Sequence, residues 1–374
     1  MGSTGSIGEQ ALEVLEAAGD GFDLVGISAH SNWERACEQA IRHGVPRIAI
    51  ADPAAAERCA AEHPGALGGE EGVRDLIAGS GADLVLNAVT GSAGLGPTIV
   101  ALTEGIDLAL ANKESLVVGG DLVTALAEAT GAAIIPVDSE HSALFQLIRS
   151  EPTPGTVERL VLTASGGPFR ERDDLTDVTI AEALKHPTWE MGGRITVDCA
   201  TLFNKGLELI EAHHLFAVPY ERIDVVVHPQ SIVHSLIHLN DGASLAHLGY
   251  PDMRVPISYA LHHPERADVP IPALDLAQAR ELTFFEPDLD RFPCLRLARE
   301  AGQDGGTAPC VLNAADEIAV EAFLDERIPF TAIPEVVART LEQMPAITPT
   351  HFSDLYATDR EARVRAAEIA DGIA

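Results

Sequence analysis

The segment PVDSEHS places two carboxylates, Asp138 and Glu140, directly after an apolar run. At positions i and i+2 of an extended segment, both side chains point to the same side. Neighbouring carboxylates repel each other unless a cation or proton lies between them, and a third, Glu208, ends the stretch ATLFNKGLE. All-oxygen ligation favours a hard cation, Mg²⁺ or Mn²⁺. By spacing alone, an acidic loop on so acidic a chain is more typical of plain solvated surface.

Polar and glycine-rich segments elsewhere supply groups that suit a phosphate. TASGGPF contributes Ser165 and two glycines, whose backbone amides can hold an anion. FNKGLE supplies Asn204 and Lys205. KHPTWEMGG, at 185–193, places His186 in a loop bounded by proline and glycine, a pattern that predicts a lid. A lone histidine is usually structural, but this density of polar residues beside apolar strands indicates chemistry.

The chain opens on a glycine-rich turn, with Gly2, Gly5 and Gly8 at a spacing of three. Such glycines let the backbone approach a pyrophosphate, which then rests on the N-terminus of the following helix. Many turns of this kind bind nothing. A turn of this type normally follows a central strand, so we expect a short apolar strand of about five or six residues ahead of Met1, and cofactor binding depends on it.

The second expected strand ends in AHSN, roughly 20 residues past the last glycine. A site for NAD usually has Asp or Glu there, to accept hydrogen bonds from the ribose hydroxyls. His30, Ser31 and Asn32 stand there instead, and neutral donors suit the additional phosphate of NADP. The alternative is an ordinary polar loop.

Basic residues are fewer than acidic ones, and lysine is rare among them. The formal net charge is −32, which argues against non-specific nucleic-acid binding. An anion site must therefore be built locally, and the acidity itself is typical of a strongly solvated surface. Lysine occurs only at Lys113, Lys185 and Lys205, and two of these follow asparagine. A compact ammonium, rather than a forked guanidinium, is indicated at those two positions.

Alternating strands and helices in the first third predict a parallel sheet. The pattern as a whole indicates an α/β protein with an N-terminal doubly wound, Rossmann-like sheet, a central α+β catalytic domain and a C-terminal helical domain. The expected boundaries are 1–137 for cofactor binding, 138–262 for catalysis, 263–288 for a linker and 289–374 for the helical domain. The strands of the first domain are expected at 22–28, 47–52, 82–89, 107–112 and 132–138.

Several classes of protein are disfavoured. No run of about 18 uncharged apolar residues predicts a membrane span. The N-terminus lacks a basic region followed by an apolar one, so we expect no signal peptide and no membrane partner. The five cysteines are widely spaced, which favours a reduced cytoplasm over a disulfide framework.

In their order, these segments resemble the 1-deoxy-D-xylulose 5-phosphate reductoisomerase family. The resemblance rests on GSTGSIG, ANKESLV, PVDSEHSALFQ, SGGPFRE, HPTWEMG, NKGLE, HPQSIVHS, LGYPDMRVPI and LNAADEIAV, which span residues 2 to about 323. It implies a homodimer that uses NADPH and a divalent metal to rearrange and reduce 1-deoxy-D-xylulose 5-phosphate to 2-C-methyl-D-erythritol 4-phosphate, in the non-mevalonate isoprenoid pathway.

The resemblance also implies roles for individual residues. The metal ligands would be Asp138, Glu140 and Glu208. Contacts with the substrate hydroxyls would come from Lys113, Ser139 and Glu140, and the phosphate would be held by Ser165, His186, Cys199, Asn204 and Lys205. Glu208 would also contact the substrate. The NADPH site would comprise Thr4, Gly5, Ser6, Ile7, His30, Ser31, Asn32, Asn112, Glu114 and Gly192. Trp189 and Met191 would lie in the closing loop.

The chain departs from the family pattern at two positions within these motifs. Cys199 stands where the family commonly has serine, and a thiol donates a weaker hydrogen bond. Gly193 replaces a larger residue, so the lid is expected to be looser. Two alternatives are another NADP-dependent, metal-assisted oxidoreductase acting on a phosphorylated polyol, and an inactive nucleotide-binding relic.

Overall fold

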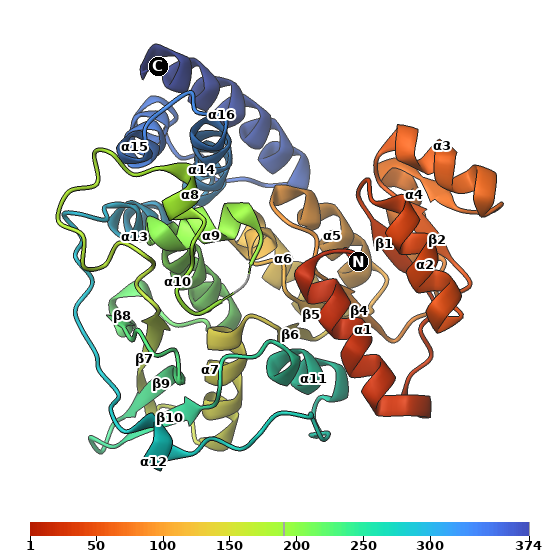
Figure 1. Cartoon of the computed structure of the whole chain (residues 1–374), viewed down its shortest axis with the longest axis horizontal. Helices are drawn as coiled ribbons and strands as arrows, with labels where there is room; N and C mark the ends of the chain where they lie inside the picture. The colour runs from red at the N-terminus through yellow and green to blue at the C-terminus, as the bar shows by residue number, and fades with distance from the viewer. Residues whose placement is uncertain (190, 374) are drawn as a thin grey trace. The chain divides into compact units, whose positions relative to one another are not determined.

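The computed structural model describes residues 1–189 and 191–373, except for the side chain of Asp20. Glu190, inside the expected lid, and Ala374 lie outside the described residues. The chain divides into two compact units. Figure 1 labels the helices and strands of both. Unit 1 comprises Met1–Ser115, Val123–Ser142 and Asp252–Ile271, and unit 2 comprises Leu116–Leu122, Ala143–Pro251 and Pro272–Ala374.

Unit 1 is built from short parallel strands separated by helices. One sheet has the order β1-β2-β3 and the other β4-β5-β6, with all neighbouring strands parallel. The strands are β1 (Ile27–Ala29), β2 (Ile48–Ile50), β3 (Leu67–Gly68), β4 (Leu84–Asn87), β5 (Asp107–Leu110) and β6 (Ile134–Pro136). The helices are α1 (Ser6–Ala18), α2 (Trp33–His43), α3 (Pro53–Glu62), α4 (Gly69–Ala78), α5 (Leu95–Thr103) and α11 (Arg254–His262), with the 3₁₀ turns Gly19–Gly21 and Ser92–Gly94.

The first residues of the chain lie between the two sheets of unit 1. The Met1 carbonyl accepts a hydrogen bond from the Ala88 amide at 3.1 Å, just beyond β4. The Ser3 amide donates to the Ser28 carbonyl of β1 at 2.8 Å. The segment that enters the glycine-rich turn is therefore held by backbone bonds to both sheets.

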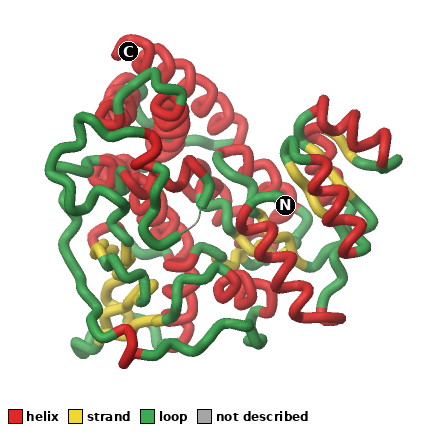
Figure 2. The backbone as a smooth tube through the Cα atoms, in the orientation of Figure 1, coloured by secondary structure: helices red, strands yellow, loops and turns green. Residues whose placement is uncertain are grey.

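Unit 2 combines a mixed sheet with a group of helices, coloured yellow and red in Figure 2. The sheet has the order β10-β9-β7-β8, in which β7 and β8 are parallel and the other pairs are antiparallel. Its strands are β7 (Val157–Ala164), β8 (Ile223–Val227), β9 (Val233–Leu239) and β10 (Ser244–Leu248). The helices are α8 (Ile180–Ala183), α9 (Gly193–Ala200), α10 (Phe203–Phe216), α12 (Leu276–Ala279), α13 (Cys294–Asp304), α14 (Ala308–Leu324), α15 (Ile333–Gln343) and α16 (Phe352–Ile373), with the 3₁₀ turns Tyr220–Arg222 and Phe330–Ala332.

Helices α6 (Glu114–Thr130) and α7 (Ser139–Ser150) contain residues of both units. Unit 2 has an extensive apolar core, to which Phe203 and Leu207 of α10, Leu160 of β7 and Leu312 of α14 all belong. This packing places α10 between the sheet and the C-terminal helices, and α10 is therefore a rigid support for the side chains on its polar face.

The expected mixed α/β fold is confirmed, with corrections in detail. The first expected strand, 22–28, begins only at Ile27, and the two-residue strand β3 and strand β10 were not expected. The extended conformation expected at 138–140 is wrong, because helix α7 starts at Ser139 and the Ser142 amide donates to the Asp138 carbonyl at 2.8 Å. Asp138 and Glu140 are thus related by the first turn of a helix rather than by strand alternation.

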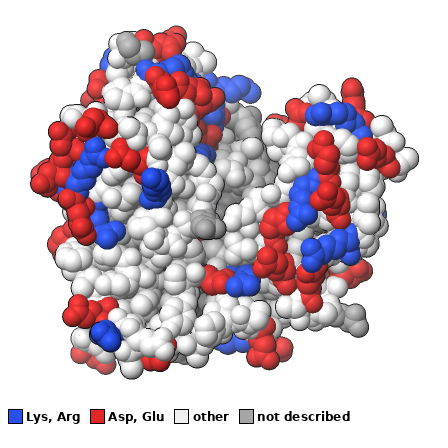
Figure 3. Space-filling model, viewed as in Figure 1, with Lys and Arg blue, Asp and Glu red and all other residues white. Residues whose placement is uncertain are grey.

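The described residues add two observations on the surface. On the face in Figure 3, acidic side chains are spread over both units with Lys and Arg side chains among them, as expected for a solvated acidic surface. Within 1–189 and 191–373, every helix falls short of the length and apolar character that crossing a membrane requires.

Candidate active site

In unit 1, Lys113 and Asp138 meet at one edge of the second sheet. Strands β5 and β6 are parallel neighbours, and the Val137 amide donates to the Leu110 carbonyl at 2.9 Å. The chain therefore leaves both strands at the same edge, and the Lys113 ammonium pairs with the Asp138 carboxylate. Both side chains are largely buried, at 7% and 12% exposure, so this ion pair is little screened by solvent.

The environment of Asp138 stabilises its ionised form. Burial alone would raise the pKa of Asp138, but the Lys113 ammonium and the His141 ring hold that pKa well below its ordinary value. His141 Nδ1 lies 3.7 Å from the Asp138 carboxylate on the first turn of α7. His141 was not among the site residues expected from the sequence, and its helical spacing of three from Asp138 was the available signal. Beside it, the Ser139 hydroxyl donates to the Glu140 carboxylate at 2.6 Å.

Asn112 and Glu114, expected near the cofactor, bind a neighbouring loop of unit 1. The buried Asn112 amide donates to the Val89 carbonyl at 2.7 Å and to the Gly91 carbonyl at 2.9 Å. The Gly91 amide donates to the Glu114 carboxylate at 3.0 Å. These bonds hold the loop after β4 beside the start of α6, so both residues shape this edge of the sheet.

The glycine-rich turn leads into the N-terminus of α1. Gly5 is the residue before the helix, and no side chain caps the helix there. Gly8 has no room for a side chain, because a Cβ would lie 2.3 Å from the Gly2 carbonyl oxygen. The first amides of the helix are thus available for an anion, as a pyrophosphate site requires. The neighbouring site candidates are Thr4, Ser6 and Ile7, of which Ser6 is exposed.

The polar loop after β1 is exposed. His30, Ser31 and Asn32 all lie on the surface of unit 1. The Asn32 side chain accepts a hydrogen bond from the Arg35 amide at 3.3 Å and caps helix α2. The cap explains the local turn, and it leaves the His30 and Ser31 side chains at the surface, where a ligand has access.

In unit 2, Asn204, Lys205 and Glu208 lie on the first turns of α10. The Glu208 carboxylate accepts hydrogen bonds from both the Asn204 amide and the Lys205 ammonium. All three residues are buried, with Glu208 only 1% exposed. Helical spacings of three and four bring them together. The buried charge of Glu208 is thus matched within its own helix, as a buried carboxylate requires.

Ser165 and His186 form a second polar pair in unit 2. His186 Nδ1 accepts from the amides of Thr188 and Trp189 at 3.1 and 2.9 Å. The ring proton therefore lies on Nε2, which donates to the Ser165 hydroxyl at 2.9 Å. Burial and the nearby Arg170 lower the pKa of His186 to about 4, so the ring is neutral at pH 7.

The glycines after Ser165 bring that loop onto α9. A Cβ on Gly167 would lie 2.7 Å from the Cys199 carbonyl oxygen, and Gly167 has a φ of +66°, so glycine is required twice over. Ser165 and Cys199 therefore belong to adjoining segments of unit 2. Gly192 is exposed and directly precedes α9.

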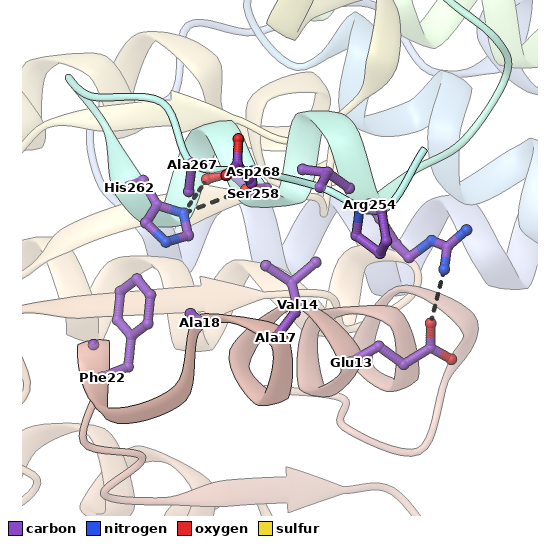
Figure 4. Close-up of a pocket in the computed structure, with 13 residues that line it drawn as sticks. Glu13, Val14, Ala17, Ala18, Phe22, Arg254, Ser258, His262, Ala267 and Asp268 are labelled. Atoms are coloured by element: carbon purple, nitrogen blue, oxygen red, sulfur yellow. Dashed lines mark hydrogen bonds and ion pairs between the residues drawn. The ribbon is translucent and has the colours of Figure 1, made fainter. Parts of the chain in front are cut away.

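The structure thus groups the expected site residues into sets within each unit. Lys113, Asp138, Ser139 and Glu140 form a set in unit 1, whereas Ser165, His186, Cys199, Asn204, Lys205 and Glu208 belong to unit 2. A separate cavity of about 300 Å³ lies in unit 1 between α1 and α11. Figure 4 shows Arg254 reaching Glu13 and Ser258 reaching His262 there, and none of the expected site residues lines it.

Three family sequence patterns match the chain. Residues 1–120 match "1-deoxy-D-xylulose 5-phosphate reductoisomerase", residues 134–216 match the C-terminal domain of the same name, and residues 248–365 match "DXP reductoisomerase C-terminal domain". Among curated proteins, the reductoisomerase of Pelotomaculum thermopropionicum is 50% identical over 97% of this chain and 95% of its own length. The reductoisomerase of Thermomicrobium roseum is 49% identical over 99% of this chain and 96% of its own length.

Solved structures agree. The reductoisomerase of Zymomonas mobilis in complex with NADPH superimposes with a TM-score of 0.91 at 40% identity, covering 99% of this chain and 97% of that one. A DOX-P reductoisomerase in complex with NADPH, fosmidomycin and magnesium gives 0.92 at 37% identity, with the same coverage. Likeness at this level extends over the whole length of the sequence, and the chain belongs to the 1-deoxy-D-xylulose 5-phosphate reductoisomerase family.

Proposed function

We propose that the two lysine–carboxylate pairs, Lys113 with Asp138 and Lys205 with Glu208, supply the catalytic groups of this chain together with Glu140. The chain is an NADPH- and divalent-metal-dependent reductoisomerase that converts 1-deoxy-D-xylulose 5-phosphate to 2-C-methyl-D-erythritol 4-phosphate for isoprenoid precursors. The observation that carries the proposal is that Asp138 and Glu208 are each paired with one of only three lysines in the chain.

The carboxylates suit a hard cation. Asp138, Glu140 and Glu208 would be the metal ligands, and all of their donor atoms are oxygens, as Mg²⁺ prefers. Asp138 is ionised at neutral pH, because the Lys113 ammonium and the His141 ring offset the cost of its burial. When bound, the metal supplies Lewis-acid stabilisation for the negative charge that develops on the substrate oxygens.

The N-terminus of α1 suits NADPH. Thr4, Gly5, Ser6 and Ile7 would contact the pyrophosphate, and the exposed His30, Ser31 and Asn32 would contact the additional phosphate. The absence of a carboxylate among those three residues supports selection of NADP over NAD. Asn112, Glu114 and Gly192 would complete the site. NADPH supplies the hydride that reduces the rearranged aldehyde.

The remaining site residues would bind and position the sugar phosphate. Lys205, Asn204, Ser165, His186 and Cys199 would hold the phosphate, with Lys205 as the cation. The neutral His186 would act there as a hydrogen-bond donor through Nε2. Binding energy from this remote phosphate would orient the reacting carbons.

Lys113, Ser139 and Glu140 would contact the substrate hydroxyls. Lys113 can donate to an oxygen that gains negative charge, while its pairing with Asp138 limits the positions that its ammonium can occupy. Trp189 and Met191 would exclude water from the centre. We further propose a cytoplasmic homodimer in which 1–137 binds the cofactor, 138–262 carries the catalytic residues and 289–374 supports them.

The proposal is tested by following NADPH oxidation with purified protein. Activity with 1-deoxy-D-xylulose 5-phosphate is expected to depend on added Mg²⁺ or Mn²⁺ and to be abolished by a chelator. Unchanged turnover in excess EDTA would overturn the metal assignment. Turnover equal to that of the parent in Asp138→Asn would remove Asp138 from the catalytic centre.

A further inference from the structure

The motif LNAADEIAV lies on α14 and has no role in the catalytic scheme above. Three of its polar residues, Asn313, Asp316 and Glu317, lie at helical spacings of three and four and share one face of the helix. Asn313 and Asp316 are fully buried, and the Glu317 side chain is 15% exposed. A buried polar face of this kind requires a partner of opposite charge.

Arg194, the second residue of α9, is that partner. Its Nη1 lies 2.9 Å from the Glu317 carboxylate, and its Nη2 donates to the Asn313 side-chain oxygen at 3.3 Å. The same nitrogen lies 3.7 Å from Asp316, and Nε lies 3.6 Å from Asp198 on α9 itself. One guanidinium thus joins helix α9 to the buried face of α14.

The acidic side of this cluster is itself held in place. The Asn313 amide donates to the Glu317 carboxylate at 3.0 Å. Arg363 of α16 donates to the other Glu317 oxygen at 2.6 Å and pairs with Asp359. Glu317 is therefore clamped between two arginines, so the position of Arg194 is determined by three helices.

A neutral Asp316 leaves three carboxylates, those of Asp198, Glu317 and Asp359, around the two guanidiniums of Arg194 and Arg363. Burial and the neighbouring Asp198 raise the pKa of Asp316 well above its ordinary value. Asp198 and Glu317 then face Arg194, while Asp359 faces Arg363. Arg194 lies against these carboxylates in a largely buried setting, where breaking its pair with Glu317 would leave a buried charge unmatched.

Helix α9 needs such an anchor because of its sequence. Two exposed glycines, Gly192 just before the helix and Gly193 at its first position, carry no side chain that could fix the start of α9. Arg194 carries the first side chain after them. Cys199 lies near the other end of α9, and after Thr201 and Leu202 the chain enters α10 with Asn204 and Lys205.

We propose that Arg194 is a positioning residue, which fixes α9 against α14 and thereby holds Cys199, Asn204 and Lys205 in place for the substrate phosphate. This inference rests on the proposed phosphate site. Arg194 itself touches neither substrate nor cofactor in this scheme. Its loss affects the affinity for the sugar phosphate, whereas the chemistry that follows binding is changed less.

The test compares Arg194→Gln with Arg194→Lys by steady-state kinetics of the full chain. Arg194→Gln is expected to raise KM for the sugar phosphate about tenfold or more, with kcat changed less than about threefold and KM for NADPH unchanged. Arg194→Lys, which keeps the charge, is expected to restore most of the loss. Arg339→Gln, which breaks an exposed pair with Glu335 on α15, is the matched control and is expected to behave like the parent.

Two further variants make every outcome decisive. Glu317→Gln weakens the same pair from the other side, and its effect on KM is expected to be non-additive with that of Arg194→Gln. It also serves if Arg194→Gln does not fold. An unchanged KM in both Arg194→Gln and Glu317→Gln would overturn the positioning role, and so would a lowered thermal stability without an effect on KM. An unchanged KM in Lys205→Met would instead overturn the phosphate site on which the inference rests.

Discussion

The two lysine–carboxylate pairs reach similar chemistry by different structural routes. In unit 2, Lys205 and Glu208 are one helical turn apart on α10, and Asn204 joins them. In unit 1, Lys113 and Asp138 come from separate segments, which meet because β5 and β6 are parallel neighbours. Both pairs are buried, yet only the pair on α10 is secured by local spacing.

This difference predicts how each pair responds to disturbance. The pair on α10 persists as long as the helix does, and the helix is fixed by an extensive apolar core. The pair in unit 1 persists only while two strands of three and four residues keep their register. The Lys113–Asp138 pair is therefore the more vulnerable to changes in packing. The Lys205–Glu208 pair is the more vulnerable to changes in its own helix.

The largest effect is expected from neutralising either carboxylate. Asp138→Asn and Glu208→Gln keep the side-chain shape but weaken the hold on a hard cation, and each is expected to lower kcat by about 10³-fold or more. The measurement is kcat across a Mg²⁺ titration, with the exposed Glu335→Gln as control. Similar losses in both variants would support Asp138 and Glu208 as ligands of the same metal. A loss in only one variant would assign the metal to that carboxylate alone.

The next largest effects are expected from replacing the two lysines, and each replacement is expected to change a different kinetic parameter. Lys205→Met is expected to raise KM for the sugar phosphate about 100-fold, because the cation that we propose to contact the phosphate is lost. Lys113→Met is expected to lower kcat by about 100-fold with a smaller change in KM, because we propose that its ammonium contacts the reacting oxygens. Initial rates over a range of substrate concentrations distinguish them. If both variants changed the same parameter, the assigned division of labour would be wrong.

Acid is expected to weaken unit 2 before unit 1. Burial lowers the pKa values of His186, His214 and His234 to about 4, against an ordinary value of 6.5. Between pH 6.5 and 4 the unfolded chain binds protons on these rings that the folded protein does not, so stability falls as the pH falls. The pKa of Asp316 is raised, so this one group makes the folded protein more stable as the pH falls and opposes the effect of the three histidines.

The same reasoning places the loss contributed by Asp138 of unit 1 at lower pH. The folded pKa of Asp138 is held below its ordinary value of 3.8, so its contribution is present above pH 3.8 and is lost only under stronger acid. Hydrogen exchange at pH 7 and pH 5 is the measurement, and protection in unit 2 is expected to decrease first. Earlier loss of protection in unit 1 at pH 5 would contradict this order.

The smallest effect is expected at Cys199. Cys199→Ser replaces a weak donor with a stronger one beside the Ser165 loop, and KM for the sugar phosphate is expected to fall about two- to threefold. The reverse change is available nearby, since Ser165→Cys should raise KM in the same assay. No improvement in Cys199→Ser would show that the thiol does not limit phosphate binding.

The sequence by itself determined much of the site, because residue type and local spacing carry the information. NKGLE supplied the candidates Asn204, Lys205 and Glu208, although their place on one face of α10 came from the structure, and GSTGSIG predicted the glycine-rich turn. The alternation of strands and helices likewise predicted the parallel sheet. Local patterning failed at Asp138–Glu140, where an acidic segment after a strand was expected to be extended and proved to begin a helix.

Only the tertiary structure decided which distant residues meet. The pairing of Lys113 with Asp138 depends on the order of strands in a sheet, and the joining of Arg194 to Asn313, Asp316 and Glu317 depends on two helices packing side by side. No local periodicity encodes such contacts. They follow from the burial of apolar surface, which brings distant segments together, and from the cost of leaving a charge buried without a partner.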